Sequence, residues 1–236
     1  MVEFLKGWCI MIFGIIVAAG KSERMGVDVD KAFLSLGTRP VLAFSLLAFE
    51  HCPLIDGVIL VVRKDRVDSA RGLVQMFGCS KVRAVVAGGA TRPESVMNGL
   101  AELGDDVKIV AVHDGARPCV TPALIEETIK SAKRCGSGVA AVKVTDTIKE
   151  VDRGTLVSRT VDRSKLWAVQ TPQTFRVDVL RKAYAFTGKK KKLVVTDEAS
   201  AVEAIGEDVH LVPSPALNVK ITTPLDLSLA AMILKV

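Results

Sequence analysis

Small and charged residues gather at three points of the sequence, each directly after an apolar run. These stretches are AAGKSERMG (18–26), GGATRPES (88–95) and VHDGARP (112–118). Glycine and alanine allow backbone N–H groups to approach a phosphate closely, and lysine and arginine neutralise its charge. The first hypothesis for this chain is therefore chemistry at a phosphate group.

The Gly-Lys-Ser of the first stretch invites comparison with the phosphate loop of kinases and GTPases. That loop requires a glycine, four residues of any type, and then Gly-Lys-Ser or Gly-Lys-Thr. Here Ile15 stands where the first glycine is needed, and residues 15–17 read Ile-Ile-Val, which suits a buried strand. We therefore reject this motif.

The composition predicts a globular protein with one large α/β domain. Hydrophobic residues make up 49% of the 236 residues and charged residues 25%, which is enough apolar material for a sizeable core. Aromatic residues are only 5%, so a base-stacking surface for single-stranded nucleic acid is poorly supplied. The net charge of +6 favours an anionic partner, and a small phosphorylated metabolite qualifies as well as a nucleic acid.

The cysteines and the N-terminus bear on location. The five cysteines are odd in number and form no CxxC pair, which favours reduced thiols in a cytoplasmic protein over disulfides or zinc. Residues 4–20 combine a lysine, an apolar run and small residues, so a signal peptide is the alternative. The apolar run is short and leads straight into a regular α/β pattern, which favours a cytoplasmic protein. The start at Met1 or at Met11 is left open. No stretch offers the ~20 apolar residues of a membrane span.

Apolar runs alternate with amphipathic segments along the first half of the chain. Strands are expected at 12–18, 56–62, 81–87 and 107–114, and helices at 40–50, 65–77, 91–103 and 121–135. This alternation predicts a largely parallel sheet covered by helices on both faces. Ligands of such sheets bind beyond the carboxyl ends of the strands, where the three loops should converge.

The pattern changes after residue 138. Residues 139–163 read as strands and a hairpin with few buried positions, and such a hairpin usually packs on a partner. Later segments are expected as helices near 177–186 and from Thr196, strands at 209–213 and 218–222, and a last helix capped by Thr223. With no linker and no repeat, residues 1–236 are interpreted as a single domain with an arm at 139–163.

Seven short motifs in order resemble one enzyme family. They are VAAGKSERMG with Lys31, GGATRPESV, VHDGARP, DTIK, TVDR, TPQTF and TDEASA. From about Ile12 to the C-terminus the chain is similar to 2-C-methyl-D-erythritol 4-phosphate cytidylyltransferases. The resemblance implies a Rossmann-like nucleotidyltransferase fold: a mostly parallel mixed sheet covered by helices on both faces, with a protruding β-arm. It also implies Mg²⁺, a homodimer joined through the arm, and no nucleic-acid or membrane partner.

The reaction so implied converts CTP and 2-C-methyl-D-erythritol 4-phosphate into the CDP-alcohol and pyrophosphate, a step of non-mevalonate isoprenoid precursor biosynthesis. The catalytic residues implied by the match are Arg24, Lys31, Arg163 and Lys220. Those implied for CTP are Ala18, Ala19, Gly20, Gly88, Gly89, Ala90 and Ser95. Those implied for the second substrate are Arg117, Thr147, Thr171 and Thr196. Asp114 is the implied ligand of Mg²⁺.

The residue types suit this chemistry. Phosphoryl-type transfer needs positioning and positive charge around phosphorus, and Arg24 and Lys31 place two cations in one loop. A carboxylate at a strand end, such as Asp114, can hold Mg²⁺ on phosphates. The alternatives are a solvated basic loop and a structural aspartate. His113 alternates to the opposite face of its strand, so we expect it to be structural.

Two positions depart from the family pattern. Asp30 stands where the family usually has proline, which adds a carboxylate beside Lys31. Ala90 replaces a frequent acidic residue, so only its backbone can contribute. Two other functions stay open: the same transfer to ribitol 5-phosphate, and nucleic-acid binding through Lys189–Lys192, which we interpret instead as a solvated loop.

Overall fold

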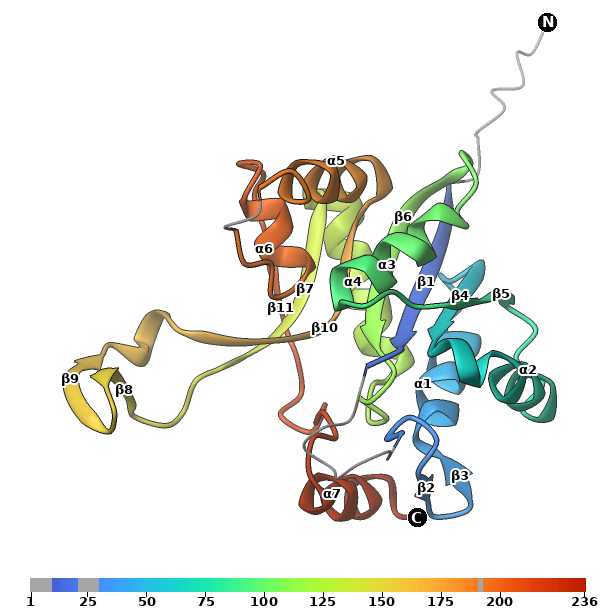
Figure 1. Ribbon diagram of the computed structural model, residues 1–236, viewed down its shortest axis with the longest axis horizontal. Coiled ribbons are helices and arrows are strands. Elements are labelled where there is room, and N and C mark those ends of the chain that lie inside the picture. Colours follow the sequence, from blue (N-terminus) through green and yellow to red (C-terminus); the bar gives the residue numbers. More distant parts are fainter. Residues whose placement is uncertain (1–9, 21–29, 191–192) are drawn as a thin grey trace, which may run out of the picture.

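The computed structural model describes residues 10–20, 30–190 and 193–236. Within these ranges one sheet has seven strands in the order β11-β7-β10-β6-β1-β4-β5, and the helices lie around it (Figure 1). Arg24 and the loop that carries it fall outside the described residues. None of the helices in the described part of the chain is both long and apolar enough to cross a lipid bilayer.

The parallel half of the sheet is built on four apolar strands. β1 (Met11–Ala18) pairs in parallel with β4 (Gly57–Val62) on one side and with β6 (Val107–Asp114) on the other, and β4 pairs in parallel with β5 (Val82–Ala87). Every residue of β4 is buried. Strands covered on both faces need apolar residues at nearly every position, and their unbroken apolar runs meet that need.

Helices cover both faces of the sheet. Their bounds are α1 (Val41–Glu50), α2 (Val67–Met76), α3 (Arg92–Ala101), α4 (Pro122–Cys135), α5 (Val177–Thr187), α6 (Glu198–Glu203) and α7 (Pro224–Leu234). Ile12 and Ile16 of β1 pack in a core with α1, α2 and α4, whereas Phe13 and Ile15 pack in a second core with α3, α5 and α6. The alternation of side chains along β1 thus feeds two separate cores, and the predicted fold class is confirmed.

The other half of the sheet contains a strand that the sequence pattern did not reveal. β10 (Trp167–Arg176) runs antiparallel between β6 and β7 (Ser137–Lys143), and β11 (Leu211–Pro213) completes the edge in parallel with β7. The sequence TPQTF within β10 looks polar, yet all five residues are buried. The Thr174 hydroxyl donates to that of Thr128 at 2.9 Å, so hydrogen bonds make its burial tolerable.

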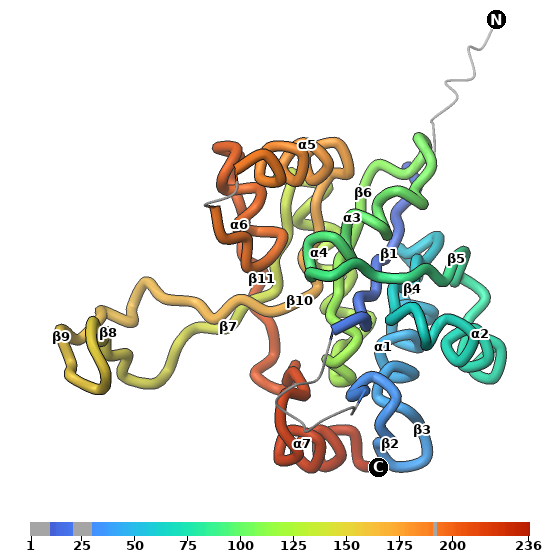
Figure 2. Tube along the Cα trace, in the orientation of Figure 1, coloured from blue at the N-terminus to red at the C-terminus, as the bar shows by residue number. Residues whose placement is uncertain are grey.

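The arm is shorter than predicted. Residues 139–143 belong to β7 and are largely buried, because GVAAV supplies apolar side chains to the sheet. The protruding part is the hairpin of β8 (Ile148–Arg153) and β9 (Leu156–Val161), which extends well away from the body of the molecule (Figure 2). Its turn exposes Leu156 by 77%.

A small third core anchors the C-terminal region. α7 packs against Leu36 of the short β2–β3 hairpin (Ser35–Leu36 and Arg39–Pro40), and the same cluster contains Cys119 and Ile221. Residues 218–222, expected as a strand, form none: their extended backbone is held where the N–H of Ile221 donates to the C=O of Ala116 at 2.8 Å. This contact brings Lys220 to the loop that follows β6.

Close packing of α4 on β7 leads to the first prediction. A Cβ added at Gly138 would lie 2.1 Å from the Thr128 carbonyl oxygen of α4. We expect Gly138→Ala to lower the free energy of unfolding by about 1–3 kcal/mol, the usual cost of overpacking. Gly72, on the exposed side of α2, has no heavy atom within 4 Å of such a Cβ. There the same change should stabilise by about 0.5–1 kcal/mol, since alanine is the better helix former.

Urea unfolding of both variants beside the wild type measures the two effects. Equal midpoints for Gly138→Ala and the wild type would contradict the close packing of α4 on β7.

Candidate active site

A pocket of about 420 Å³ lies beyond the carboxyl ends of β1, β5 and β6. Its lining comes from the three loops singled out above and from the C-terminal segment: Val17, Ala18, Ala19, Gly20, Asp30, Lys31, Ala32, Gly89, Ala90, Thr91, Arg92, Ser95, Asp114, Ala116 and Lys220. The predicted convergence of the loops at one edge of the sheet is therefore confirmed.

Small residues let two of these loops touch. A Cβ at Gly88 would lie 2.4 Å from Cβ of Ala19 and 2.7 Å from Oγ of Ser95, so no side chain fits there. The Ser95 hydroxyl accepts from the N–H of Gly89 at 3.1 Å and donates to the C=O of Thr91 at 3.0 Å. In this structure Ser95 braces the loop with its hydroxyl.

Ala90 contributes through its backbone, as expected from its side chain. Its N–H donates to Oε2 of Glu94 at 2.8 Å. Thr91 is the N-cap of α3, and its hydroxyl accepts from the N–H of Glu94. The loop is thus fixed by the first turn of the helix that follows it.

Three cations surround the carboxylate of Asp114. Arg92 Nε lies 3.2 Å from Oδ1, Lys220 Nζ lies 2.7 Å from Oδ2, and Arg117 Nε lies 3.6 Å from Oδ2. Burial alone would raise the pKa of the Asp114 carboxyl, but Arg92, Lys220 and Arg117 hold it well below its usual range. Asp114 is therefore ionised, and it gathers positive charge at the floor of the pocket.

The residues beside and beneath Asp114 fix its position. The Thr171 hydroxyl accepts from the N–H of Asp114 at 3.0 Å and shares a hydrogen bond of 3.0 Å with Nδ1 of His113. His113 is fully buried, and burial lowers its pKa to about 3, so the imidazole is neutral. His113 is structural, as its position in the strand predicted. Thr171, expected to contact the second substrate, lies buried beneath the pocket and supports Asp114.

Asn218 and Arg117 fasten the segment that carries Lys220. The Asn218 amide donates to Oε1 of Gln170 at 3.1 Å and to the C=O of Thr171 at 2.9 Å, and its own C=O accepts from Arg117 Nη1 at 2.9 Å. Burial lowers the pKa of the Arg117 guanidinium although Asp114 lies next to it. In this structure Arg117 is mostly buried and joins Asp114 to the C-terminal segment.

Asp30 shapes the turn that places Lys31 in the lining. Its Oδ1 accepts from the N–H of Ala32 at 3.2 Å, and its C=O accepts from the N–H of Phe33 at 3.0 Å. Its Oδ2 lies 3.6 Å from Arg66 Nε. Burial raises the pKa of the Asp30 carboxyl despite the hydrogen bond from Ala32 and the nearby arginines. Hydrogen bonding thus restrains this turn where proline usually does in the family.

Not all of the expected site residues line the pocket. Gly88 lies just behind the lining, while Thr147, Arg163 and Thr196 contribute nothing to it among the described residues. Thr147 precedes β8, and Arg163 follows β9 and donates to the C=O of Thr145, so both belong to the arm. Their contact with a substrate stays a prediction, as does the role of Arg24.

Two buried residues were missed by the sequence analysis. The Glu198 carboxylate is completely buried and accepts two hydrogen bonds from Arg92. Gln173 is 1% exposed, and its amide holds the start of α6 by donating to Asp197 at 2.9 Å and accepting from the N–H of Ala199 at 2.9 Å. The signal for both lay in the TPQTF and TDEASA motifs, where only the threonines were interpreted.

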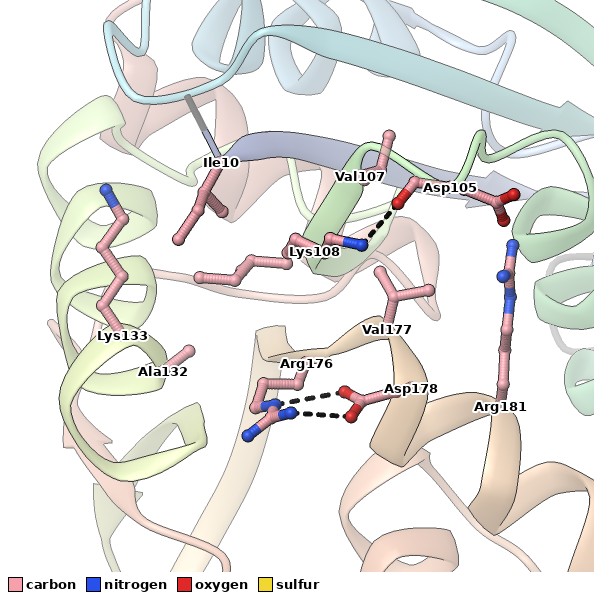
Figure 3. A pocket seen from close by; sticks show the side chains of 11 residues that line it. Ile10, Asp105, Val107, Lys108, Ala132, Lys133, Arg176, Val177, Asp178 and Arg181 are labelled. Atoms are coloured by element: carbon pink, nitrogen blue, oxygen red, sulfur yellow. Dashed lines mark hydrogen bonds and ion pairs between the residues drawn. The ribbon is translucent and has the colours of Figure 1, made fainter. Parts of the chain in front are cut away.

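A second, larger pocket of about 850 Å³ lies at the opposite end of the sheet, where β6 begins and β10 ends (Figure 3). Its cations are already engaged: Arg176 Nη2 lies 2.7 Å from Asp178, and Lys108 Nζ donates to the C=O of Asp105 at 2.6 Å. Arg181 donates to two carbonyl groups near the end of α3. None of the three phosphate-suited loops reaches this pocket, so the smaller one is the candidate active site.

Comparison with known proteins agrees with this placement. The family profile described as 2-C-methyl-D-erythritol 4-phosphate cytidylyltransferase matches residues 12–236. The chain is 43% identical over 222 residues to the protein of that name from Alkaliphilus oremlandii, covering 94% of each chain. It is 45% identical over 221 residues to the one from Dehalococcoides mccartyi, covering 94% of this chain and 95% of that one.

Solved structures agree with the fold. A 4-diphosphocytidyl-2C-methyl-D-erythritol synthase from Anaerococcus prevotii superposes with a TM-score of 0.84 at 30% identity, covering 96% of this chain and 99% of its own. The cytidylyltransferase from Thermus thermophilus gives a TM-score of 0.77 at 32% identity, covering 94% and 98%.

The fold and the pocket at its strand ends therefore define a nucleotidyltransferase. More narrowly, the chain belongs to the 2-C-methyl-D-erythritol 4-phosphate cytidylyltransferase family.

The fastening by Asn218 leads to the second prediction. Asn218→Ala removes a side chain that is 1% exposed and leaves a buried carbonyl of Thr171 without its donor. We expect the free energy of unfolding to fall by about 1–3 kcal/mol, the cost of an unsatisfied buried polar group. Asn98→Ala is the matched control, because Asn98 is exposed and donates only to the C=O of Ala87. Urea unfolding measures both, and equal losses for the two variants would contradict the role given to Asn218.

Proposed function

We propose that this chain transfers the cytidylyl group of CTP to 2-C-methyl-D-erythritol 4-phosphate, releasing pyrophosphate. The observation that carries the proposal is the pocket at the strand ends, where small-residue loops meet a cluster of cations around Asp114. The relatives named for this reaction match nearly the whole chain. The reaction belongs to the formation of isoprenoid precursors by the non-mevalonate route.

The reaction requires little covalent assistance from the protein. A phosphate oxygen of the polyol phosphate attacks the α-phosphorus of CTP, and the bond from that phosphorus to the oxygen bridging to the β-phosphorus breaks. The electron pair leaves with pyrophosphate. Because the attacking phosphate is already ionised at neutral pH, no general base is needed. The protein must align two anions and offset their repulsion.

The lining supplies the positive charge for this task. Lys31 and Lys220 both face the pocket, and Arg92 lies between the nucleotide loop and Asp114. Donors that are already in place when charge develops on the phosphate oxygens stabilise the transition state without reorganisation. Arg24 and Arg163 are proposed to add to this charge.

The loops 18–20 and 88–95 are proposed to hold the nucleotide. Their backbone N–H groups can approach a triphosphate because Ala18, Ala19 and Gly20 carry little or no side chain. The narrow space between Ala19 and Gly88 favours a pyrimidine over a purine. Ser95 and the backbone of Gly89 and Ala90 would then read the edge of the cytosine.

Mg²⁺ is proposed to arrive with CTP. Asp114 offers one carboxylate, and the described residues contain no group of three or more acidic, histidine or cysteine side chains that would form a complete metal cage. A single carboxylate suits Mg²⁺, which is commonly held by one or two carboxylates together with substrate phosphates. The ion would add positive charge on the triphosphate oxygens.

The third prediction tests the reaction itself. With CTP, we expect pyrophosphate release to be faster with methylerythritol phosphate than with ribitol 5-phosphate, measured as kcat/KM in one coupled assay. CTP should also exceed UTP, which differs in the exocyclic group of the base, and ATP, whose purine is larger. Equal efficiency with ribitol 5-phosphate would favour the CDP-ribitol-forming alternative, and equal release from ATP would contradict the pyrimidine site.

A homodimer is proposed on the exposure of the arm. β8 and β9 pair only with each other in the described structure, and Leu156 and Val157 are exposed by 77% and 49%. A two-stranded hairpin is marginal by itself, and a two-fold axis allows two identical arms to cover each other. We propose that Thr147 enters the active site of the neighbouring subunit with the arm. A cytoplasmic location is proposed as well, since the four described cysteines form no disulfide.

The fourth prediction tests the shared site. Lys31→Ala and Thr147→Val are expected to be inactive by themselves. When the two variants are unfolded and refolded together, half of the dimers are mixed, and each mixed dimer has one site with both natural residues. Roughly a quarter of wild-type activity should return.

Thr160→Val is the matched control, because Thr160 lies on the same hairpin and bonds only to Lys149 there. It should remain active by itself. Mixed dimers without recovered activity would place Thr147 with its own subunit or outside any site, and a monomer in solution would remove the premise.

A further inference from the structure

A completely buried carboxylate joins two parts of the active site that are distant in sequence. Glu198 is the first residue of α6, and Arg92 is the first residue of α3. Arg92 Nη1 donates to Glu198 Oε1 at 2.6 Å, and Nη2 donates to Oε2 at 3.0 Å. The Tyr184 hydroxyl of α5 donates to Oε1 at 2.8 Å. This paired geometry fixes the plane of the guanidinium as well as its position.

Arg92 spans two carboxylates. While both Nη atoms bind Glu198, Nε donates to Oδ1 of Asp114 at 3.2 Å. Burial would lower the pKa of the Arg92 guanidinium, but Glu198 and Asp114 raise it above its ordinary value. Arg92 therefore stays charged, and its orientation depends on Glu198.

The segment that holds Glu198 also carries Thr196. Gln173 clamps this segment to β10 through Asp197 and the N–H of Ala199. Thr196 is exposed and lies two residues before Glu198, so it cannot move far without disturbing the bond to Arg92. The polyol-phosphate side and the nucleotide side of the site are thus joined through one ion pair.

We propose that Glu198 is a positioning residue that couples the two substrates, an inference that rests on the proposed function. Glu198 touches neither substrate. It holds Arg92 against the nucleotide loop and, through the same bond, orders the segment that presents Thr196. When one substrate orders this bridge, the other meets a site that is already ordered, so each tightens the binding of the other.

The experiment measures this coupling directly. The affinity for a CTP analogue with a methylene group between the α- and β-phosphorus, which cannot react, is measured by calorimetry with and without saturating methylerythritol phosphate. In the wild type we expect the polyol phosphate to tighten the analogue by roughly ten-fold, within the range seen for coupled sites. In Glu198→Gln, which keeps the shape and removes the charge, this factor should fall to about one.

Glu203→Gln is the matched control, since Glu203 is exposed on the same helix. It should keep the wild-type factor. A structural role alone would lower the stability of Glu198→Gln and leave the factor unchanged. A wild-type factor in folded Glu198→Gln, or the same loss in Glu203→Gln, overturns the inference.

Tyr184→Phe covers the case in which Glu198→Gln does not fold. It removes only the hydroxyl that donates to Glu198, and the coupling factor should fall to an intermediate value. A wild-type factor in Tyr184→Phe would then overturn the inference. Turnover separates the two levels: a wild type that releases no pyrophosphate with methylerythritol phosphate ends the proposed function and the inference together. A wild type that turns over while Glu198→Gln keeps its coupling ends the inference alone.

Discussion

The buried negative charge of Asp114 constrains the rest of the pocket. A carboxylate taken out of water must be paired, and this one is paired with Arg92, Lys220 and Arg117 from three different parts of the chain. Such a cluster adds little net stability, because the desolvation of each charge offsets the attraction between them. Removing one member is costly, since it leaves a buried charge unpaired. The cluster thus specifies where the three segments must meet.

The surrounding fold can be understood as support for that meeting point. β6 ends at Asp114, and the neighbouring β10 supplies Thr171, which holds its backbone, and Gln173, which holds the start of α6. The third core draws Ile221 to Ala116 and so delivers Lys220. With Glu198 neutralising part of Arg92, two carboxylates face three cations. The remaining positive charge suits anionic substrates with several phosphate groups.

Much of this arrangement could be predicted from local patterns. The unbroken apolar runs of β1, β4 and β6 indicated a parallel sheet, and a parallel sheet places its loops at one edge, so the pocket could be located before any coordinates were known. β10 could not be found this way. TPQTF lacks an apolar run, and its burial depends on partners such as Thr128 that lie far away in sequence. Residues 218–222 have the opposite fault, because an apolar pattern there packs against a loop instead of a strand.

The sequence by itself determined the fold class, the family and the three loops that line the pocket, because these depend on residue type and short spacing. Only the tertiary structure decided which charged groups meet. Arg92 and Glu198 are separated by 106 residues, and nothing in the spacing of either motif pairs them. Likewise, the expected contact residue Thr171 proved to be buried support for Asp114. Burial and pairing arise from distant segments packed together, so a local pattern carries no record of them.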